Sequence, residues 1–329
     1  MIFTLLVVLL LCLPIVWPVV LVVLLYLGGP LLIPEALQLV VTMVLDDFRE
    51  LKRHFFPVKK SLAGEIILVT GGGRGIGRLM ALDFASKNAI VVIWDKQGAE
   101  EVAGEIKKMG KKGFGYTCDL SKRESIYETA AKVKQEIGDV DILINNAGIV
   151  TGKPFMDSSD EMIELSMKVN SLAHFWTLKA FLPAMLKKRK GHVVTIASSA
   201  GLTGVPGLVD YCASKYAAMG IDESLRHELY KENLHHVHTT VVCPFFINTG
   251  MFDGVTTRFP QLLPILDAHY AAKKIVFAVE TNQVQLCMPI MIWSLSWIRS
   301  IFPAPSMAKI SNFLGVWDSM NDFKGRQHK

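Results

Sequence analysis

The sequence has few cysteines, and their placement disfavours two classes of protein. Five cysteines are spread over 329 residues, their number is odd, and no two form a CxxC pair. A disulfide-stapled scaffold and a cysteine-based metal site are therefore disfavoured, and a reducing compartment is favoured for the main domain. The five are Cys12, Cys118, Cys212, Cys243 and Cys287.

Charge is also sparse and nearly balanced. Asp, Glu, Lys and Arg make up 20% of the residues, and the formal net charge is +5. No run of Lys and Arg is dense enough to form an arm that binds nucleic acid, so we expect no nucleic-acid partner. Hydrophobic residues make up 51%, which excludes disorder and a collagen-like chain.

Residues 1–45 contain a single charged residue, Glu35. Residues 5–27 are almost entirely Leu, Val and Ile, and a helix of that length, about 35 Å, would cross a bilayer core of about 30 Å. Gly28-Gly29-Pro30 interrupts the run, so a single span followed by an interfacial segment and a hairpin within one leaflet both stay open. A cleaved signal peptide is disfavoured because the segment lacks an initial Lys or Arg. We predict a hydrophobic membrane anchor over residues 1–45.

Residues 46–60 form a basic linker after this anchor. Arg49, Lys52, Arg53, Lys59 and Lys60 follow the apolar run, and positive charge beside a span favours the cytosolic side. The catalytic domain should therefore face the cytosol.

Short apolar runs alternate with helical patterns between residues 61 and 280. This alternation predicts one α/β domain of the Rossmann type, a doubly wound parallel sheet with helices on both faces. The predicted strands are 65–70, 90–94, 113–118, 141–145, 192–197 and 237–242, and the predicted helices include 75–87, 100–109, 123–137 and 211–230.

Residues 281–329 form a C-terminal apolar extension. Trp293 and Trp297 lie four apart, on one face of a predicted helix. Membrane contact, a lid over an apolar pocket and ordinary core packing all fit this pattern.

The first predicted strand leads directly into a glycine-rich loop and then a helix. Gly71 permits the tight turn, Gly75 lets backbone approach a pyrophosphate, and Gly77 lets the helix pack on the strand. The helix N-terminus supplies N–H groups to the phosphates. Asp95 ends the second strand, where a carboxylate can bind a ribose 2′-hydroxyl. These residues predict a dinucleotide site that uses NAD, although Arg74 and Lys96 nearby could bind the 2′-phosphate of NADP.

Tyr211 and Lys215 lie four apart on one helix face. A neighbouring ammonium group should lower the pKa of the phenol from about 10, so that it can exchange a proton with an alcohol or carbonyl. Ser198 ends a predicted strand, where its hydroxyl can polarise the substrate oxygen.

With these motifs, the chain resembles the short-chain dehydrogenase/reductase family over residues 61–280. The resemblance implies that Tyr211 is the acid/base, that Lys215 also binds the nicotinamide ribose, and that Ser198 orients the substrate. It implies that Asn170 holds a water in the proton relay and that Asp119 contacts the adenine. The cofactor-binding residues implied by the glycine loop and by the resemblance are Gly71, Arg74, Gly75, Ile76, Gly77, Asp95, Asp119, Leu120, Asn145, Ala147, Gly148, Tyr211, Lys215 and Thr249. Phe245 stands where the family has glycine, which puts the local loop path in doubt.

A narrower resemblance covers nearly the whole chain and points to the membrane-bound retinol dehydrogenase branch. The segments that carry it include Trp94-Asp95, residues 174–183 and residues 321–326. The branch implies an anchored enzyme of the endoplasmic reticulum membrane or a lipid droplet that interconverts retinol and retinal. A 17-beta-hydroxysteroid dehydrogenase acting on a steroid and a catalytically idle nucleotide-binding lipid-droplet protein are the alternatives. A homodimer is a further expectation from the family.

Two other groups of residues have several interpretations. His235, His236 and His238 cluster in what the sequence suggests is a polar loop, where solvation is favoured over metal binding, so no metal is expected. Apolar residues after the sixth strand could line an apolar substrate slot or pack as a lid. They are Met251, Phe252, Phe259, Leu262 and Leu263.

Overall fold

The computed structural model describes residues 33–326, and the chain falls into two compact units, Met1–Lys59 and Lys60–Lys329. Most of the predicted anchor, residues 1–32, lies outside the described residues. Helix α2 (Ile33–Phe55) spans the end of the predicted anchor and the start of the predicted linker. Within residues 33–326, no helix combines the length and the apolar character needed to cross a membrane.

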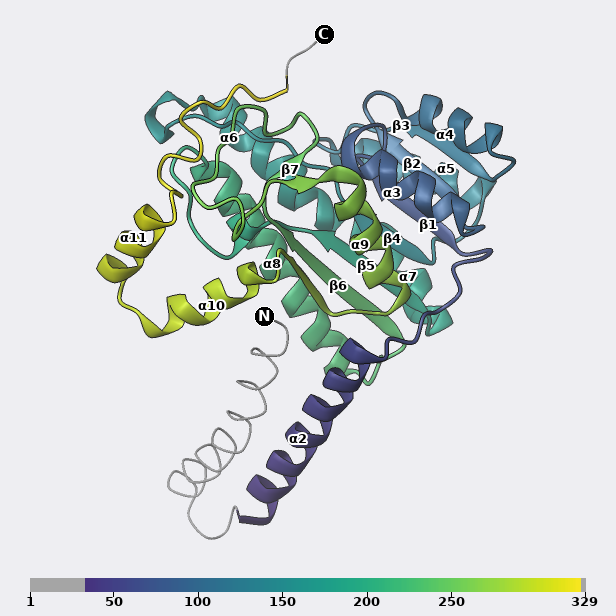
Figure 1. Cartoon of the computed structure of the whole chain (residues 1–329). Coiled ribbons are helices and arrows are strands. Elements are labelled where there is room, and N and C mark those ends of the chain that lie inside the picture. Colours follow the sequence, from purple (N-terminus) through teal and green to yellow (C-terminus); the bar gives the residue numbers. More distant parts are fainter. Residues whose placement is uncertain (1–32, 327–329) are drawn as a thin grey trace. The chain divides into compact units, whose positions relative to one another are not determined.

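A seven-stranded parallel sheet forms the centre of the second unit (Figure 1). Its order is β3-β2-β1-β4-β5-β6-β9. The first three strands extend the sheet to one side of β1, and β4 and the later strands extend it to the other side. The strands are β1 (Ile66–Thr70), β2 (Ile90–Asp95), β3 (Gly113–Thr117), β4 (Ile142–Asn145), β5 (Gly191–Ile196), β6 (Val237–Pro244) and β9 (Gln285–Met288). This is a Rossmann-type α/β fold, as the alternating pattern predicts.

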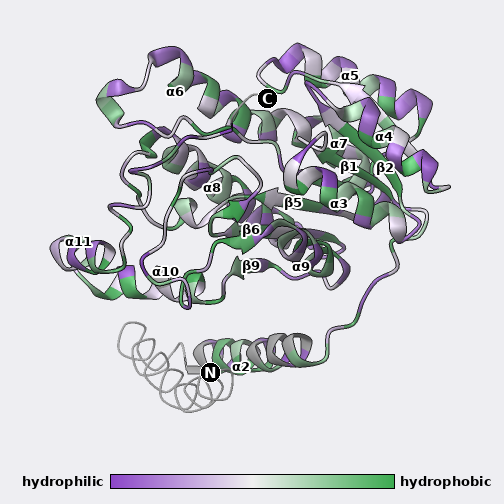
Figure 2. Cartoon of the chain, turned by 45° about the horizontal axis from the view of Figure 1, so that its top comes forward, coloured by the Kyte–Doolittle hydropathy of each residue, from purple (hydrophilic) through white to green (hydrophobic). Residues whose placement is uncertain are grey.

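Helices cover both faces of the sheet. One buried cluster joins the sheet to α3 (Gly75–Ser86), α4 (Ala99–Lys108) and α9 (Ala268–Glu280). The second joins it to α5 (Arg123–Glu136), α7 (Ala173–Lys188) and α8 (Val209–Lys231). Figure 2 shows green, hydrophobic strands at the centre and purple, hydrophilic residues on the outer helices α4 and α5. Parallel strands buried on both faces read as continuous apolar runs, which is why β1 and β2 are so easily found in the sequence.

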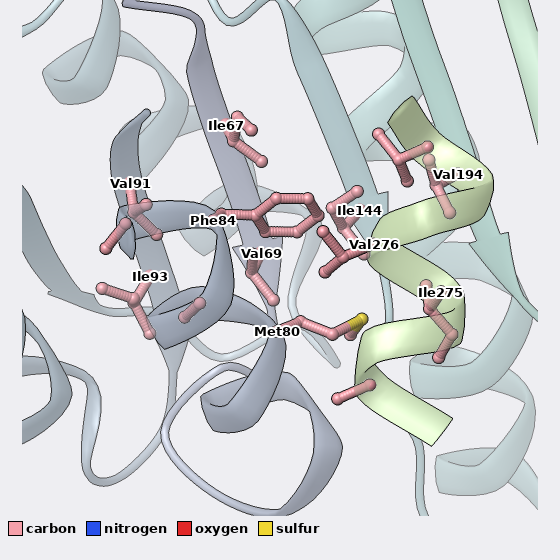
Figure 3. Packing of buried hydrophobic residues seen from close by; sticks show 14 of the residues in the cluster. Ile67, Val69, Met80, Phe84, Val91, Ile93, Ile144, Val194, Ile275 and Val276 are labelled. Carbon is pink, nitrogen blue, oxygen red and sulfur yellow. The ribbon is translucent and has the colours of Figure 1, made fainter. Parts of the chain in front are cut away.

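The packing of α3 on the sheet fixes the position of the loop that precedes this helix. Met80 and Phe84 lie one helical turn apart, are fully buried, and contact the sheet beside Val69 and the α9 residue Val276 (Figure 3). Side chains four apart on a helix share one face, so this pair directs that face at the core. The first turn of α3 is therefore held against the end of β1.

Three features differ from the sequence expectations. The sheet has a seventh strand, β9, beyond residue 280. The sequence did not predict it, because a four-residue strand before a proline gives almost no alternating pattern. His238 lies within β6, as the predicted strand 237–242 requires, and not in a polar loop with His235 and His236. Two short strands, β7 (Ile247–Asn248) and β8 (Leu266–Asp267), pair after β6, and α10 (Met291–Ile301) and α11 (Ala304–Phe313) follow β9.

Candidate active site

The loop between β1 and α3 leaves no room for side chains at Gly73 and Gly77. A Cβ atom on Gly77 would lie 2.2 Å from the Gly71 carbonyl oxygen, and one on Gly73 would lie 2.1 Å from the Gln97 carbonyl oxygen. Gly71 and Gly75 have φ angles of 62° and 57°, which other residues rarely adopt. The first turn of α3 has no acidic residue and no capping side chain. Its N–H groups and helix dipole therefore suit an anion.

Thr70 and Asn146 hold this loop in place, and sequence reasoning missed both. The Thr70 hydroxyl accepts from the backbone N–H groups of Asn146 and Ala147 at 3.0 and 3.2 Å. The Asn146 amide donates to the carbonyl oxygens of Thr70 and Gly71 at 2.9 and 3.1 Å. Asn145, a predicted cofactor residue, is buried, and its side-chain oxygen accepts from the Thr177 hydroxyl at 2.8 Å.

The predicted acids lie around the glycine loop. One Asp95 carboxylate oxygen accepts from the Gly73 backbone N–H at 3.0 Å, so the end of β2 is tied to the loop. Burial raises the pKa of Asp119, but hydrogen bonds from Ser121 and the Lys96 ammonium 3.2 Å away outweigh it and hold the pKa below its usual value. Lys96 is thus engaged by Asp119.

The other predicted cofactor residues take two kinds of position. The Leu120 side chain is buried in the core, and Ile76 packs against the opposite core cluster. A Cβ atom on Gly148 would lie 3.5 Å from the Asn170 side-chain oxygen and 3.6 Å from the Lys215 ammonium, and one on Gly75 would lie 3.6 Å from the Thr249 Cβ. Gly148 therefore borders the predicted catalytic residues, and Thr249 lies across from the glycine loop.

Ser198, Tyr211 and Lys215 come together where β5 ends and α8 begins. Tyr211 and Lys215 are 5% and 3% exposed, and the Lys215 ammonium lies 5.6 Å from the centre of the Tyr211 ring. The same ammonium donates to the Ile196 carbonyl oxygen at 2.8 Å, at the end of β5. The Ser198 hydroxyl lies near enough to the Tyr211 phenol to affect its pKa, and it accepts from the Ala200 N–H at 3.1 Å.

The pKa of Tyr211 differs from the sequence expectation. Burial raises it above its usual value, and the hydrogen bond with Ser198 only partly opposes this rise. Lys215 does not lower the pKa of Tyr211 as predicted. Burial lowers the pKa of Lys215 itself to about 8, and its ammonium is directed at the Ile196 carbonyl. The phenol is therefore protonated at neutral pH.

Asn170 lies in a single π-helical turn, η3 (Lys168–Leu172), between α6 (Asp160–Met167) and α7. Its side chain accepts from the Ile149 N–H at 2.8 Å and donates to the Ile149 carbonyl and the Ser214 hydroxyl, each at 2.9 Å. Such turns are frequent at functional sites. Both ends of the amide are engaged, so Asn170 fixes the loop after β4 against the helix that carries Tyr211.

Phe245 continues the edge of the sheet despite standing where a glycine was expected. Its N–H donates to the Met288 carbonyl at 2.7 Å, and its ring lies 4.6 Å from the centre of the Phe246 ring. The local path is thus an extension of the pairing between β6 and β9.

An apolar cavity of about 50 Å³ begins at Ser198 and Tyr211. Helices α10 and α11 supply part of its wall, and of the five residues predicted to line a slot, Phe252 and Leu263 do so. Met251, Phe259 and Leu262 do not line it; Phe259 stacks on Phe313 of α11 instead. Apolar lining residues include Phe245, Phe246, Phe252, Leu263, Ile292 and Met307.

The site as a whole fits a dinucleotide. The glycine loop is a cradle that a Cβ atom would fill at Gly73 and Gly77, and it faces the anion-binding end of α3. A protonated phenol, a hydroxyl and a buried ammonium group stand together at the mouth of an apolar cavity. Such an arrangement can orient an alcohol or carbonyl and exchange a proton with its oxygen.

Comparison with known proteins agrees with this geometry. The short chain dehydrogenase family profile matches residues 65–258. The chain is 48% identical over 274 residues to epidermal retinol dehydrogenase 2 of Homo sapiens, covering 82% of this chain and 89% of that protein. It is 40% identical over 296 residues to retinol dehydrogenase 10 of Homo sapiens, covering 81% and 87%.

Solved structures show the same fold. A metagenomic short-chain oxidoreductase in complex with NADP has a TM-score of 0.57 and 28% identity, covering 69% of this chain and 96% of that one. A short chain dehydrogenase/reductase from Burkholderia phymatum in complex with NAD has a TM-score of 0.66 and 24% identity, covering 73% and 94%. The resemblance found in the sequence is confirmed: the chain belongs to the short-chain dehydrogenase family and is an oxidoreductase acting on CH–OH groups.

Proposed function

We propose that the protein interconverts a lipophilic alcohol and its carbonyl, with all-trans-retinol and retinal as the substrate pair. The apolar cavity that begins at the hydroxyls of Ser198 and Tyr211 carries this proposal. Its lining is mostly apolar and includes these two hydroxyls, which suits a long apolar molecule with one oxygen. The names of the relatives, retinol dehydrogenases over more than four-fifths of the chain, support the retinoid.

In this proposal the chain's residues place the substrate and move one proton. A bound nicotinamide supplies or accepts the hydride. Ser198 hydrogen-bonds the substrate oxygen, and the Tyr211 phenol exchanges a proton with it. Because the raised pKa keeps the phenol protonated at neutral pH, Tyr211 is in the form that gives a proton to a carbonyl. Lys215, buried and next to Tyr211, would bind the nicotinamide ribose.

The cofactor preference follows from the end of β2. Asp95 is held at the glycine loop by the Gly73 N–H, and its charge would repel a 2′-phosphate. Lys96 is paired with Asp119. Arg74 is the remaining predicted cation that could bind the 2′-phosphate of NADP. We propose NAD as the preferred cofactor.

We also propose that the protein is anchored to the cytosolic side of the endoplasmic reticulum membrane or a lipid droplet. Residues 5–27 are apolar and are followed by basic residues. On α2, Leu37, Val41 and Leu45 form an exposed apolar stripe. On α10, Trp293, Trp297 and Ile301 are 39%, 59% and 72% exposed and lie along one face, so core packing does not account for them.

The cavity must open to admit a retinoid. Its volume is about 50 Å³, whereas pockets for molecules of that size measure about 300–1,000 Å³. The α10 and α11 residues in its wall would then act as a lid whose outer face meets the lipid.

Membranes that carry the full chain test this function. They would be given all-trans-retinol with NAD or NADP, and retinal with NADH or NADPH, with estradiol as a competing substrate. We expect retinoid turnover with a preference for NAD. The variant Tyr211→Phe should lose a factor of about 10²–10⁴ in kcat while its Kd for the dinucleotide stays unchanged.

The matched control is Tyr230→Phe, the same change at an exposed position of the same helix, and it should keep full activity. Turnover of estradiol alone would assign the protein to steroids. Full retinoid turnover by Tyr211→Phe would refute the proton-transfer role.

A further inference from the structure

The chain that follows α11 returns to the active-site face of the domain. In Figure 1 this yellow segment runs back above β7. The Thr256 N–H donates to the Ser319 carbonyl at 3.1 Å, and the N–H groups of Lys324 and Gly325 donate to the Asp253 carbonyl at 2.8 and 3.3 Å. Residues 319–326 are thus bound along the loop after β7.

Two glycines make space for this segment. A Cβ atom on Gly152 would lie 2.0 Å from the Phe323 ring, and one on Gly254 would lie 1.9 Å from the Asp322 carbonyl oxygen. The Phe323 ring also lies 6.4 Å from the ring of Phe252, which lines the apolar cavity. The loops after β4 and β7 therefore fix the path of the segment.

The segment ends with Arg326 at the glycine loop. A Cβ atom on Gly75 would lie 3.9 Å from one Arg326 guanidinium nitrogen and 3.6 Å from the Thr249 Cβ. Gly75 is the first residue of α3. The guanidinium therefore stands at the N-terminus of this helix, where Thr249 also approaches Gly75.

This placement gathers positive charge. Partial burial lowers the pKa of Arg326, and the neighbouring Arg74 guanidinium lowers it further, while Asp95 and Asp253 oppose the shift. The N-terminus of α3 adds the positive end of a helix dipole and has no acid in its first turn. Asp95 and Asp253 offset part of this charge, and a bound anion would be attracted to the two guanidinium groups and the helix N-terminus.

We propose that Arg326 is a cofactor-binding residue whose guanidinium binds the pyrophosphate of the dinucleotide at the N-terminus of α3, so that residues 319–326 fasten over the bound cofactor. The pyrophosphate is favoured over a 2′-phosphate because the guanidinium lies at Gly75, the first residue of α3, where the helix N–H groups suit a pyrophosphate. This inference rests on the proposed function, since it requires a bound nicotinamide dinucleotide.

The test measures binding to the full chain in detergent or nanodiscs. The change Arg326→Gln should raise the Kd for NAD and NADP by a similar factor of about ten or more. The Kd for ADP-ribose, which keeps the pyrophosphate, should rise by the same factor. The Kd for 2′-AMP, which lacks the pyrophosphate, should stay unchanged. Lys309→Gln, an exposed cation on α11, is the matched control and should leave every Kd unchanged.

A second readout follows the segment itself. NAD should slow amide hydrogen exchange in residues 319–326 of the wild type and should do so much less in Arg326→Gln. Gly254→Ala, which pushes Asp322 away, should weaken NAD binding as well.

The outcomes separate the two proposals. Unchanged binding of NAD by Arg326→Gln, or a loss confined to NADP and 2′-AMP, would overturn the role at the pyrophosphate and leave the proposed function standing. A wild type that binds neither dinucleotide would overturn both.

Discussion

The buried Lys215 and the half-buried Lys60 lie near the carboxyl and amino ends of β5, and desolvation lowers the pKa of each to about 8. Lys215 belongs to the active site, whereas Lys60 lies at the opposite end of the strand. The Lys60 ammonium is 2.8 Å from Nδ1 of the buried His192, whose other ring nitrogen lies 2.8 Å from the Thr240 hydroxyl. Burial, with the nearby Lys60 charge, keeps the pKa of His192 well below its usual value. This ring is therefore neutral, and its Nδ1 accepts a hydrogen bond from the Lys60 ammonium.

Lys60 should give stability an unusual pH dependence. The native protein releases the Lys60 proton near pH 8, while the unfolded chain keeps it to about pH 10.5. The unfolded state then binds more protons in this window, so the Lys60 contribution to the unfolding free energy rises with pH. Below pH 8 both states are protonated and the cost of burial is fully present. We expect the wild type to gain about 1–3 kcal/mol relative to Lys60→Met between pH 8 and 10.

Denaturant unfolding of both proteins across this range measures the difference. Lys112→Met removes an exposed lysine and should run parallel to the wild type. Parallel curves for Lys60→Met would show that the Lys60 pKa is not depressed.

Residue identity alone predicts part of the site. Ser198, Tyr211 and Lys215 are brought together as their spacing on a strand end and a helix face suggests. The sequence could not show which of two adjacent asparagines supports the glycine loop, because alternation along the strand directs Asn145 inward and leaves Asn146 to bond Thr70. The sequence also could not predict the raised pKa of Tyr211. Burial raises this pKa more than a neighbouring ammonium would lower it, and burial depends on the whole fold.

An exposed arginine, Arg258, contacts the end of α11. Arg258 donates to the Phe313 carbonyl at 3.1 Å, and its guanidinium lies 5.4 Å and 5.5 Å from the ring centres of Phe313 and Phe259. The loop before β8 is thereby joined to the end of α11.

Removing that contact should loosen α11 alone. We expect Arg258→Ala to speed amide hydrogen exchange in α11 by about two- to tenfold, as a cation–π contact and one hydrogen bond contribute about 1 kcal/mol. Exchange in α3 should not change. Arg123→Ala, which removes an exposed arginine stacked on Trp176 and paired with Glu124, is the control. Equal exchange of α11 in all three proteins would contradict this function of Arg258.

Elements with a strong local pattern were predictable, and those defined by distant contacts were not. The first six strands appear within two residues of their expected bounds. The seventh exists because β6 offers an edge to Gln285–Met288, and the π-helical turn at Asn170 depends on bonds to Ile149 and Ser214. Neither partner is near in sequence, so no local periodicity could reveal them.

For the molecule as a whole, the exposed stripe on α10 gives the domain a surface suited to lipid. Tryptophan is favoured at the interface of a bilayer, where its ring is partly buried and partly hydrated. If this stripe delivers substrate, the double change Trp293→Ser and Trp297→Ser should raise the KM for retinol in vesicles about tenfold. The kcat, and the KM for a short water-soluble alcohol, should stay as in the wild type.

Tyr127→Ser, which removes an exposed aromatic residue from α5, is the control for surface polarity. A rise in KM for the soluble alcohol as well would point to damage at the cavity wall, because Ile292 on the same helix lines it. An unchanged KM for retinol would remove α10 from the path of the substrate.

Residues 319–326 are synthesised long after the glycine loop that they approach. The glycine loop leaves the ribosome long before Arg326, and at about 5–20 residues per second the delay is roughly ten to fifty seconds. During that time the first strands and helices can pair, yet the segment that packs against Gly152 and Gly254 does not exist. A nascent chain, or one shortened by a late stop codon, would thus hold most of the sheet while its catalytic face stays open to solvent.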